Sequence, residues 1–189
     1  MRFPARPHVL GVDDGPFRKR QAAPVPVVAV AMEGADLVES VAVASFPVDG
    51  AGATEFLARW IAGLRSRAGL HAVVLGGITL AGLGIVEIPA LAARLGLPVL
   101  AVARRDTARS ELARALRAAR LEDRIALAAA TPPAFRVHEG LWVSAAGVER
   151  AAAERLVRAT VRKAALPEPL RVAHLLARAL ALGESRGRV

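Results

Sequence analysis

The first third of the chain predicts a sheet that begins with antiparallel strands. An apolar run at 8–12 leads into Asp13-Asp14-Gly15-Pro16, and these residue types are typical of a turn after a strand. Two further apolar runs, at 24–32 and 37–48, are separated only by Glu33-Gly34-Ala35-Asp36. A connection this short predicts that the two runs form an antiparallel hairpin.

The periodicity then changes to that of alternating helices and parallel strands. Continuous apolar runs predict strands at 71–75 and 97–103, which we expect to be parallel and buried on both faces. Helical spacing predicts helices over 54–67, 85–95, 107–120, 147–165 and 168–182, and 137–144 is expected to add an edge hairpin or irregular strand. The prediction is an α/β fold, one mixed sheet flanked by helices, with 1–189 as a single domain because no linker interrupts it.

Composition excludes several classes of protein. The chain has 189 residues, 54% of them hydrophobic, and no cysteine. A chain of this length can bury roughly 70% of its unfolded surface, so disorder is not expected. Without cysteine there is no disulfide, thiolate zinc site or cysteine nucleophile. The longest uncharged run, 72–86, is shorter than the roughly 20 residues of a membrane span, and no signal peptide is expected at the N-terminus, so we expect a cytoplasmic protein.

The net charge of +9 favours an anionic partner. All but two of the 26 basic residues are arginine, the exceptions being Lys19 and Lys163. GC-rich coding produces the same arginine bias without any function, so the composition alone leaves a solvated basic surface open. The cluster Arg18-Lys19-Arg20 after the first strand is nevertheless a candidate contact for nucleic acid phosphates.

Common catalytic motifs are absent from the sequence. There is no Walker phosphate loop, no Gly-x-Ser-x-Gly elbow and no His-Glu-x-x-His pair. The glycines of 76–84 do not follow the dinucleotide fingerprint, because Glu87 stands where its third glycine would be. P-loop, serine hydrolase and zinc protease chemistries are therefore not expected.

Asp13 and Asp14 are the strongest local signal for a site. Two carboxylates at the end of a buried strand are costly unless a cation meets them, and Mg²⁺ is usually held by one or two carboxylates with waters and substrate phosphates. Neighbouring strand residues face opposite sides, so one of the pair would face a given site. A turn in which Asp14 caps backbone amides explains the pattern equally well. Asp49 follows the third strand at the edge where the first also ends, and a turn role is open for it too.

His174 lies on the polar stripe of the last predicted helix. Arg171 and Arg178 are three residues before and four after it, hence on the same face. This spacing favours contact with a phosphate or a metal over a place in the core, and a solvated stripe is the alternative. The other histidines have no partner pattern and are taken as structural.

Five blocks of sequence occur in one order over almost the whole chain. They are Gly11-Val12-Asp13-Asp14-Gly15-Pro16-Phe17, Val48-Asp49-Gly50 with Ala53-Thr54, Gly77-Ile78-Thr79-Leu80-Ala81-Gly82, Pro167-Glu168-Pro169-Leu170-Arg171-Val172-Ala173-His174 and Gly183-Glu184-Ser185-Arg186-Gly187-Arg188. These blocks resemble the signature blocks of the endonuclease dU family, which is similar to endonuclease V.

The resemblance implies an RNase H-like fold and a Mg²⁺- or Mn²⁺-dependent endonuclease for DNA carrying deaminated bases, with deoxyuridine the expected lesion and DNA repair the expected role. Asp13 matches the Gly-x-Asp metal ligand of endonuclease V, Asp49 corresponds by position to an acid after the third strand, and His174 matches the residue that closes the C-terminal block. Asp14 would be a supporting or substitute ligand. Arg171, Arg178 and Arg18-Lys19-Arg20 would contact the DNA backbone.

One departure from endonuclease V affects the expected activity. Endonuclease V has a further catalytic aspartate after its fourth strand, where this chain has Leu75-Gly76-Gly77. Two-ion catalysis depends on shared carboxylates, so the loss indicates a single-metal site or a metal held largely by substrate. The alternatives to an active nuclease are a nucleic-acid-binding module that has lost catalysis and a binder of an acidic metabolite or nucleotide.

Overall fold

The structure of the protein is a computed structural model that describes residues 2–18, 21, 23–105, 109–162 and 165–185. The elements along the chain are β1 (His8–Asp14), β2 (Val25–Glu33), β3 (Leu37–Phe46), α1 (Ala53–Ala62), a 3-10 helix (Arg65–Gly69), β4 (Ala72–Leu75), β5 (Thr79–Leu80), β6 (Gly84–Ile85), α2 (Ile88–Leu95), β7 (Val99–Ala103), α3 (Arg109–Ala118), α4 (Arg124–Ala129), β8 (Phe135–His138), β9 (Leu141–Ala146), α5 (Arg150–Thr160) and α6 (Glu168–Leu182).

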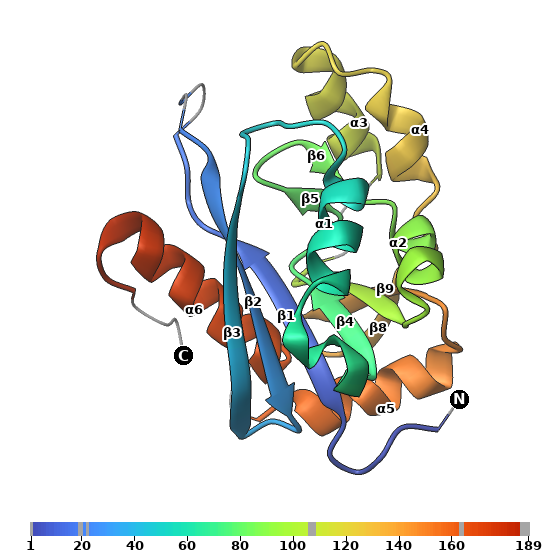
Figure 1. The fold of residues 1–189 in the computed structure, drawn as a ribbon. Coiled ribbons are helices and arrows are strands. Elements are labelled where there is room, and N and C mark those ends of the chain that lie inside the picture. The colour runs from blue at the N-terminus through green and yellow to red at the C-terminus, as the bar shows by residue number, and fades with distance from the viewer. Residues whose placement is uncertain (1, 19–20, 22, 106–108, 163–164, 186–189) are drawn as a thin grey trace.

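A seven-stranded mixed sheet forms the centre of the molecule, in the order β3-β2-β1-β4-β7-β9-β8 (Figure 1). β1, β2 and β3 are antiparallel neighbours, while β1, β4 and β7 run parallel. β8 and β9 continue the sheet in antiparallel pairing. The expected mixed sheet, with its antiparallel start, parallel centre and edge hairpin, is confirmed.

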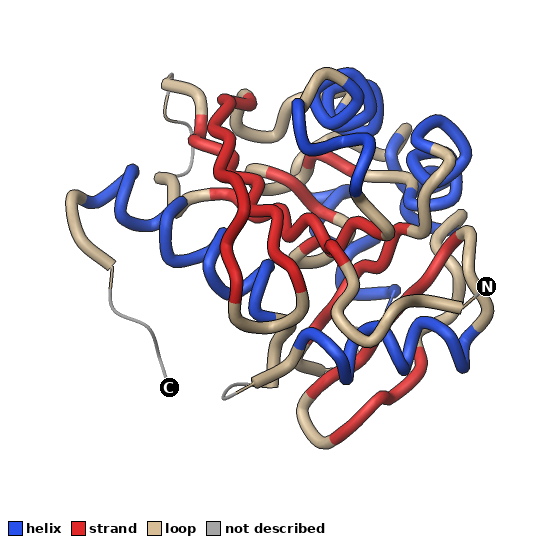
Figure 2. Tube along the Cα trace, turned by 60° about the horizontal axis from the view of Figure 1, so that its bottom comes forward, coloured by secondary structure: helices blue, strands red, loops and turns tan. Residues whose placement is uncertain are grey.

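Helices cover both faces of this sheet, as Figure 2 shows. On one face, α1 and α2 pack on side chains such as Leu10, Val27 and Val73. On the other, α5 packs against β4, β7 and β9, and α6 lies against β1 and β2. Apolar side chains on both faces of the central strands explain why these strands appear in the sequence as continuous apolar runs.

A glycine within β1, Gly11, and one just after it, Gly15, allow α6 to lie directly on the strand. Gly11, Asp13 and Gly15 alternate, so they face the same side of the sheet. A Cβ at Gly11 would be 2.1 Å from the carbonyl carbon of Pro169, and one at Gly15 would be 2.8 Å from the carbonyl oxygen of Ala177. The backbones of strand and helix therefore meet without intervening side chains. This contact brings the polar side of α6 to the end of β1.

The structure also differs from the sequence-based expectations in places. The glycine-rich segment after β4 contains a small hairpin, β5–β6, where a loop was expected. The short helix α4 was not predicted. The helix expected over 54–67 ends at Ala62 and is followed by a 3-10 turn. The helix expected over 147–165 is shorter, since α5 covers only Arg150–Thr160. Among the described residues, no helix is both long and apolar enough to span a membrane.

Candidate active site

Asp13 and His174 form a hydrogen-bonded pair at the carboxyl end of β1. The Nδ1–H of His174 donates to Oδ2 of Asp13 at 2.7 Å, and the side chains are 50% and 18% exposed, respectively. A carboxylate on Nδ1 fixes the tautomer of a neutral imidazole, so that Nε2 carries the lone pair. The half-exposed imidazole is thus oriented by a largely buried carboxylate.

Gly76 leaves room for the other oxygen of Asp13. It follows β4, the parallel neighbour of β1, and a Cβ at Gly76 would lie only 2.6 Å from Oδ1 of Asp13. Any larger residue here would force Asp13 to move. This is the position where endonuclease V was expected to carry its additional aspartate, and here the space belongs to the Asp13 carboxylate.

Asp14, the next residue of β1, lines the same groove as Asp13 and is partly buried. Burial raises its pKa from 3.8 to about 6, and the neighbouring charge of Asp13 adds to this effect. A hydrogen bond from the backbone N–H of Ala81 acts in the other direction, because it favours the charged form. Because burial disfavours the ionised form of Asp14, a nearby cation would stabilise that form.

Asp49 is engaged elsewhere, in a contact between two loops. Its Oδ1 accepts a hydrogen bond from the N–H of Leu83 at 2.8 Å, and its own N–H donates to the carbonyl of Ala81. Gly82 fits against it because a Cβ there would lie 2.4 Å from the same Oδ1. Asp49 therefore connects the loop after β3 to the β5–β6 hairpin, and among the described residues it does not join Asp13 and His174 in a three-ligand cluster.

Arg124 supports the same loops from α4. Its Nη1 lies 2.7 to 3.1 Å from the carbonyl oxygens of Asp49, Gly50 and Leu83. The side chain is buried, and no carboxylate pairs with it among the described residues. A buried guanidinium thus holds the loop after β3 and the β5–β6 hairpin together through their backbone carbonyls.

A groove of about 1610 Å³ runs past Asp13, Asp14 and His174. It lies over the carboxyl ends of β1, β4 and β7, where open α/β sheets commonly bind ligands. Five arginines line it. They are Arg104, Arg105, Arg117, Arg171 and Arg178.

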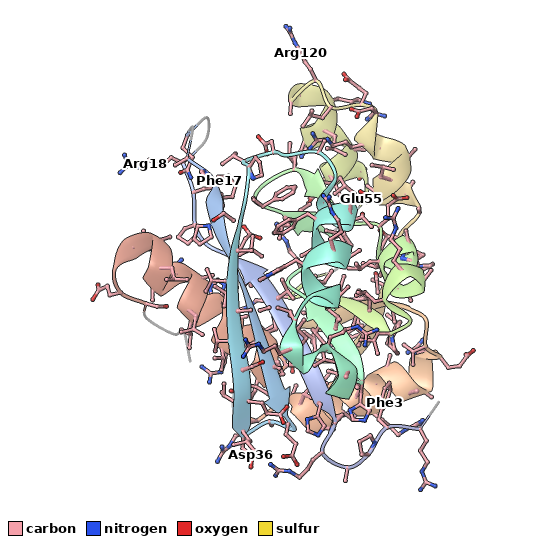
Figure 3. The ribbon with its side chains drawn as sticks, in the orientation of Figure 1. Phe3, Phe17, Arg18, Asp36, Glu55 and Arg120 are labelled. Carbon is pink, nitrogen blue, oxygen red and sulfur yellow. The ribbon has the colours of Figure 1, made fainter. Side chains whose placement is uncertain are left out.

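These arginines differ in the charge that they offer to a ligand. Arg171 forms a two-pronged ion pair with the buried carboxylate of Glu168, which raises its pKa and offsets its charge. Arg178 has no acidic partner within the part of the chain that the structure describes. Arg18 is exposed just beyond β1 and does not line the groove (Figure 3), whereas Lys19 and Arg20 lie outside the described residues.

The carboxylates of Asp13 and Asp14 fit one hard cation better than two. Within the described residues, no three acidic or histidine side chains converge on a single point. The partly exposed carboxylate of Asp13 and a second carboxylate whose ionisation needs a cation match an ion that takes one or two protein carboxylates and fills its shell with water and phosphate.

Solved structures share this architecture. A crystal structure of a protein of unknown function from Archaeoglobus fulgidus is 30% identical, with a TM-score of 0.85 over 93% of this chain and 98% of that one. Endonuclease V from Streptomyces avermitilis is 22% identical with a TM-score of 0.60, covering 95% and 83% of the two chains. Endonuclease V from Ciona intestinalis, in complex with DNA containing an inosine, is 12% identical with a TM-score of 0.57, covering 89% and 82%. The protein therefore has an endonuclease V-like fold.

Sequence comparison gives the family. The family model of endonuclease dU matches residues 5–181, and the chain belongs to this family. A relative from Methanothermobacter thermautotrophicus, named only as a UPF0215 protein, is 35% identical over 184 residues, which are 95% of this chain and 90% of the relative. Family and fold together support a nuclease.

Sequence reasoning missed residues that shape the site without carrying a recognisable motif. Arg124 was not identified because a single arginine on a short helix gives no sign that it is buried. The sequence also provided no reason to single out Arg104, Arg105 and Arg117, because arginine is frequent throughout the chain. For the helix contact a signal did exist, because glycines at 11 and 15 flank Asp13 on the same face of β1.

Proposed function

We propose that this protein is a divalent-metal-dependent endonuclease that hydrolyses a phosphodiester bond in DNA carrying a deaminated base, with deoxyuridine as the expected lesion and DNA repair as its role. The observation that carries the proposal is the Asp13–His174 pair, which opens into an arginine-lined groove at the carboxyl ends of the central strands. A fold shared with an endonuclease V bound to DNA supports the choice of substrate.

His174 is the group placed to handle the proton of the attacking water. With Nδ1–H donating to Asp13, the lone pair on Nε2 can accept a proton as the water oxygen bonds to phosphorus. Asp13 then stabilises the imidazolium that forms. The bond that breaks joins phosphorus to a sugar oxygen, and the leaving oxygen takes up a proton to give a hydroxyl end.

Asp13 and Asp14 are the carboxylates that would hold Mg²⁺ or Mn²⁺. A bound divalent cation supplies positive charge against the phosphate and lowers the pKa of a coordinated water. The partly buried Asp14 gains most from that charge, because burial disfavours its ionised form. Asp49 instead positions the loop beside the groove through Leu83.

The groove arginines would neutralise the backbone phosphates on both sides of the cut. Arg178 is one helical turn beyond His174 and has its charge available, while Arg104 and Arg105 extend the same surface past the end of β7. Such contacts position the nucleic acid without reading its sequence. Binding should therefore weaken steeply with salt, as expected when several phosphates are neutralised.

The test is cleavage of an end-labelled duplex with one central deoxyuridine, with Mg²⁺ or Mn²⁺ and with EDTA. Wild type should cut only with metal, and Asp13→Asn and His174→Gln should each lose at least about 100-fold in rate. Asp36→Asn is the matched control, since Asp36 is an exposed acid at the opposite end of the molecule from Arg18 (Figure 3). Equal cutting by Asp13→Asn would refute the proposal.

The glycine at position 76 supports one alternative function, which is DNA binding without cleavage. Because no carboxylate stands at this position, the same fold could bind damaged DNA without cutting it. That function predicts salt-dependent binding of the deoxyuridine duplex by wild type and no cleavage with either metal. The cleavage assay, run beside a binding titration, separates the two functions.

A further inference from the structure

The part of the groove beneath α3 and α4 differs chemically from the part beside His174. It is walled by apolar side chains, and Trp142 and Ser144 of β9 also line it. The residues that define this chamber are Leu112, Leu116, Ile125, Ala128, Trp142 and Ser144. A largely apolar recess beside a charged groove is typical of a site for the uncharged part of a ligand.

Ser144 places one polar group inside this chamber. The residue is only 9% exposed, and its hydroxyl forms no hydrogen bond with the residues that the structure describes. Ser144 pairs with Ala101, whose methyl group offers no partner. Because Ser144 lines the groove, its hydroxyl is open there and can hydrogen-bond to a ligand.

Trp142 lies two positions earlier on β9 and therefore faces the same side as Ser144. Its indole is partly exposed to the groove, while the intervening Val143 is buried in the core on the other face of the sheet. A flat aromatic surface with a single hydrogen-bonding group beside it suits a planar heterocycle.

Positive charge lies next to the chamber. Arg104 and Arg105 follow β7, whose last residue, Ala103, pairs with Trp142, and Arg117 projects from α3. All three are exposed and have no acidic partner in the described part of the chain. A phosphate can therefore sit beside the recess without entering it.

We propose that the chamber is a nucleobase subsite, in which a base lies against Trp142 and hydrogen-bonds to Ser144 while its phosphates contact Arg104 and Arg105. This inference rests on the proposed nuclease function, because the base belongs to the nucleic acid that reaches Asp13 and His174. It assigns base reading to β9.

Trp142 provides a direct measurement of occupancy. The chain has only two tryptophans, and Trp60 packs on Phe56 in α1. A Trp60→Phe variant therefore reports on Trp142 alone. The probe is a hexanucleotide of abasic analogues with one uracil, compared in EDTA with an all-abasic hexanucleotide of equal charge. The uracil probe should quench Trp142 and bind about tenfold more tightly.

Ser144→Ala should weaken binding of the uracil probe about fivefold and leave binding of the all-abasic probe unchanged. Ser45→Ala is the matched control, because Ser45 is an exposed serine on the edge strand β3. Equal binding of the two probes, or equal behaviour of the two serine variants, would overturn the subsite. If wild type cleaves the deoxyuridine duplex but Trp142 does not respond to the base, only the subsite fails. If Trp142 responds but nothing is cut, only the proposed nuclease activity fails.

Discussion

The backbone of Gly11 lies directly against that of Pro169, so close that a Cβ on the glycine would be 2.1 Å from the proline carbonyl carbon. This contact joins β1 to the first turn of α6, two segments at opposite ends of the sequence. The next residue of β1 on the same face, Asp13, is the partner of His174. The position of the imidazole relative to the carboxylate therefore depends on a backbone-to-backbone contact.

Gly11→Ala should separate α6 from β1. The clash is with backbone atoms, which cannot rotate away, so we expect a loss of about 3 kcal/mol or more in the free energy of unfolding. Cleavage should fall further than stability alone explains, because the Asp13–His174 distance changes. The control is Gly69→Ala, where no atom lies within 4 Å of the added methyl. Denaturant unfolding of both variants measures the effect, and equal stability would contradict the packing argument.

Asp14 should make the free energy of unfolding depend on pH. Its pKa is about 6 in the folded protein against 3.8 for the free side chain, so the folded state binds the proton more tightly. Unfolding free energy should therefore be highest below about pH 4, fall as the pH rises to about 6, and be flat above that, with a total contribution of up to about 3 kcal/mol.

Asp14→Asn removes this dependence. In EDTA, we expect the variant to be more stable than wild type at pH 8 and to approach it at pH 4. Denaturant titrations at pH 4, 6 and 8 give the difference, with Asp123→Asn, an exposed acid on the other side of the groove, as the control. A constant difference between Asp14→Asn and wild type over this range would show that Asp14 is already ionised at pH 4.

Asp49 should tolerate replacement by asparagine but not by alanine. Asparagine keeps an oxygen that accepts from the Leu83 N–H, and it tolerates the positive φ of 52° at this position. Alanine has no such acceptor and adopts a positive φ only at a cost. We expect Asp49→Asn to retain folding and most cleavage, and Asp49→Ala to lose about 1 to 3 kcal/mol of stability. A large loss of cleavage in a stable Asp49→Asn would instead show that its charge binds the metal.

Arg124→Met should release α4 from the two loops that it supports. Three carbonyl oxygens lose a charged donor in a buried place, so we expect a loss of about 3 kcal/mol, which is roughly 6 to 12 °C in melting temperature for a chain of this size. Arg114→Met makes the same change at an exposed position of α3 and should leave the melting temperature unchanged. Equal melting temperatures would mean that the loops hold their positions without Arg124.

Sequence reasoning succeeded where a local pattern determines the structure. The alternation and apolar runs of β1, β2 and β3 and the bounds of α6 were predicted closely, because these elements bury one clear stripe or both faces. The polar side of α6 with His174 was also predicted. Its buried side was not, since the small Ala173 and Ala177 are buried while the larger Leu180 is exposed.

Relationships between distant segments could not be predicted in the same way. The separation of Asp49 from Asp13 depends on the path of the loop that carries Gly82, and hydropathy says nothing about such a path. The burial of Arg124 depends on which carbonyls surround it in three dimensions. Ser144 has an ordinary place in a strand pattern, and only its missing partner, visible once the fold is known, distinguishes it.

The glycine after β4 also limits how this site could change in evolution or by design. An acid introduced at position 76 would occupy the space of Oδ1 of Asp13, so the present aspartate conformation and an extra carboxylate exclude one another. Converting the site to a richer set of acids by a substitution at this position would thus require the Asp13 carboxylate, which His174 contacts through Oδ2, to shift.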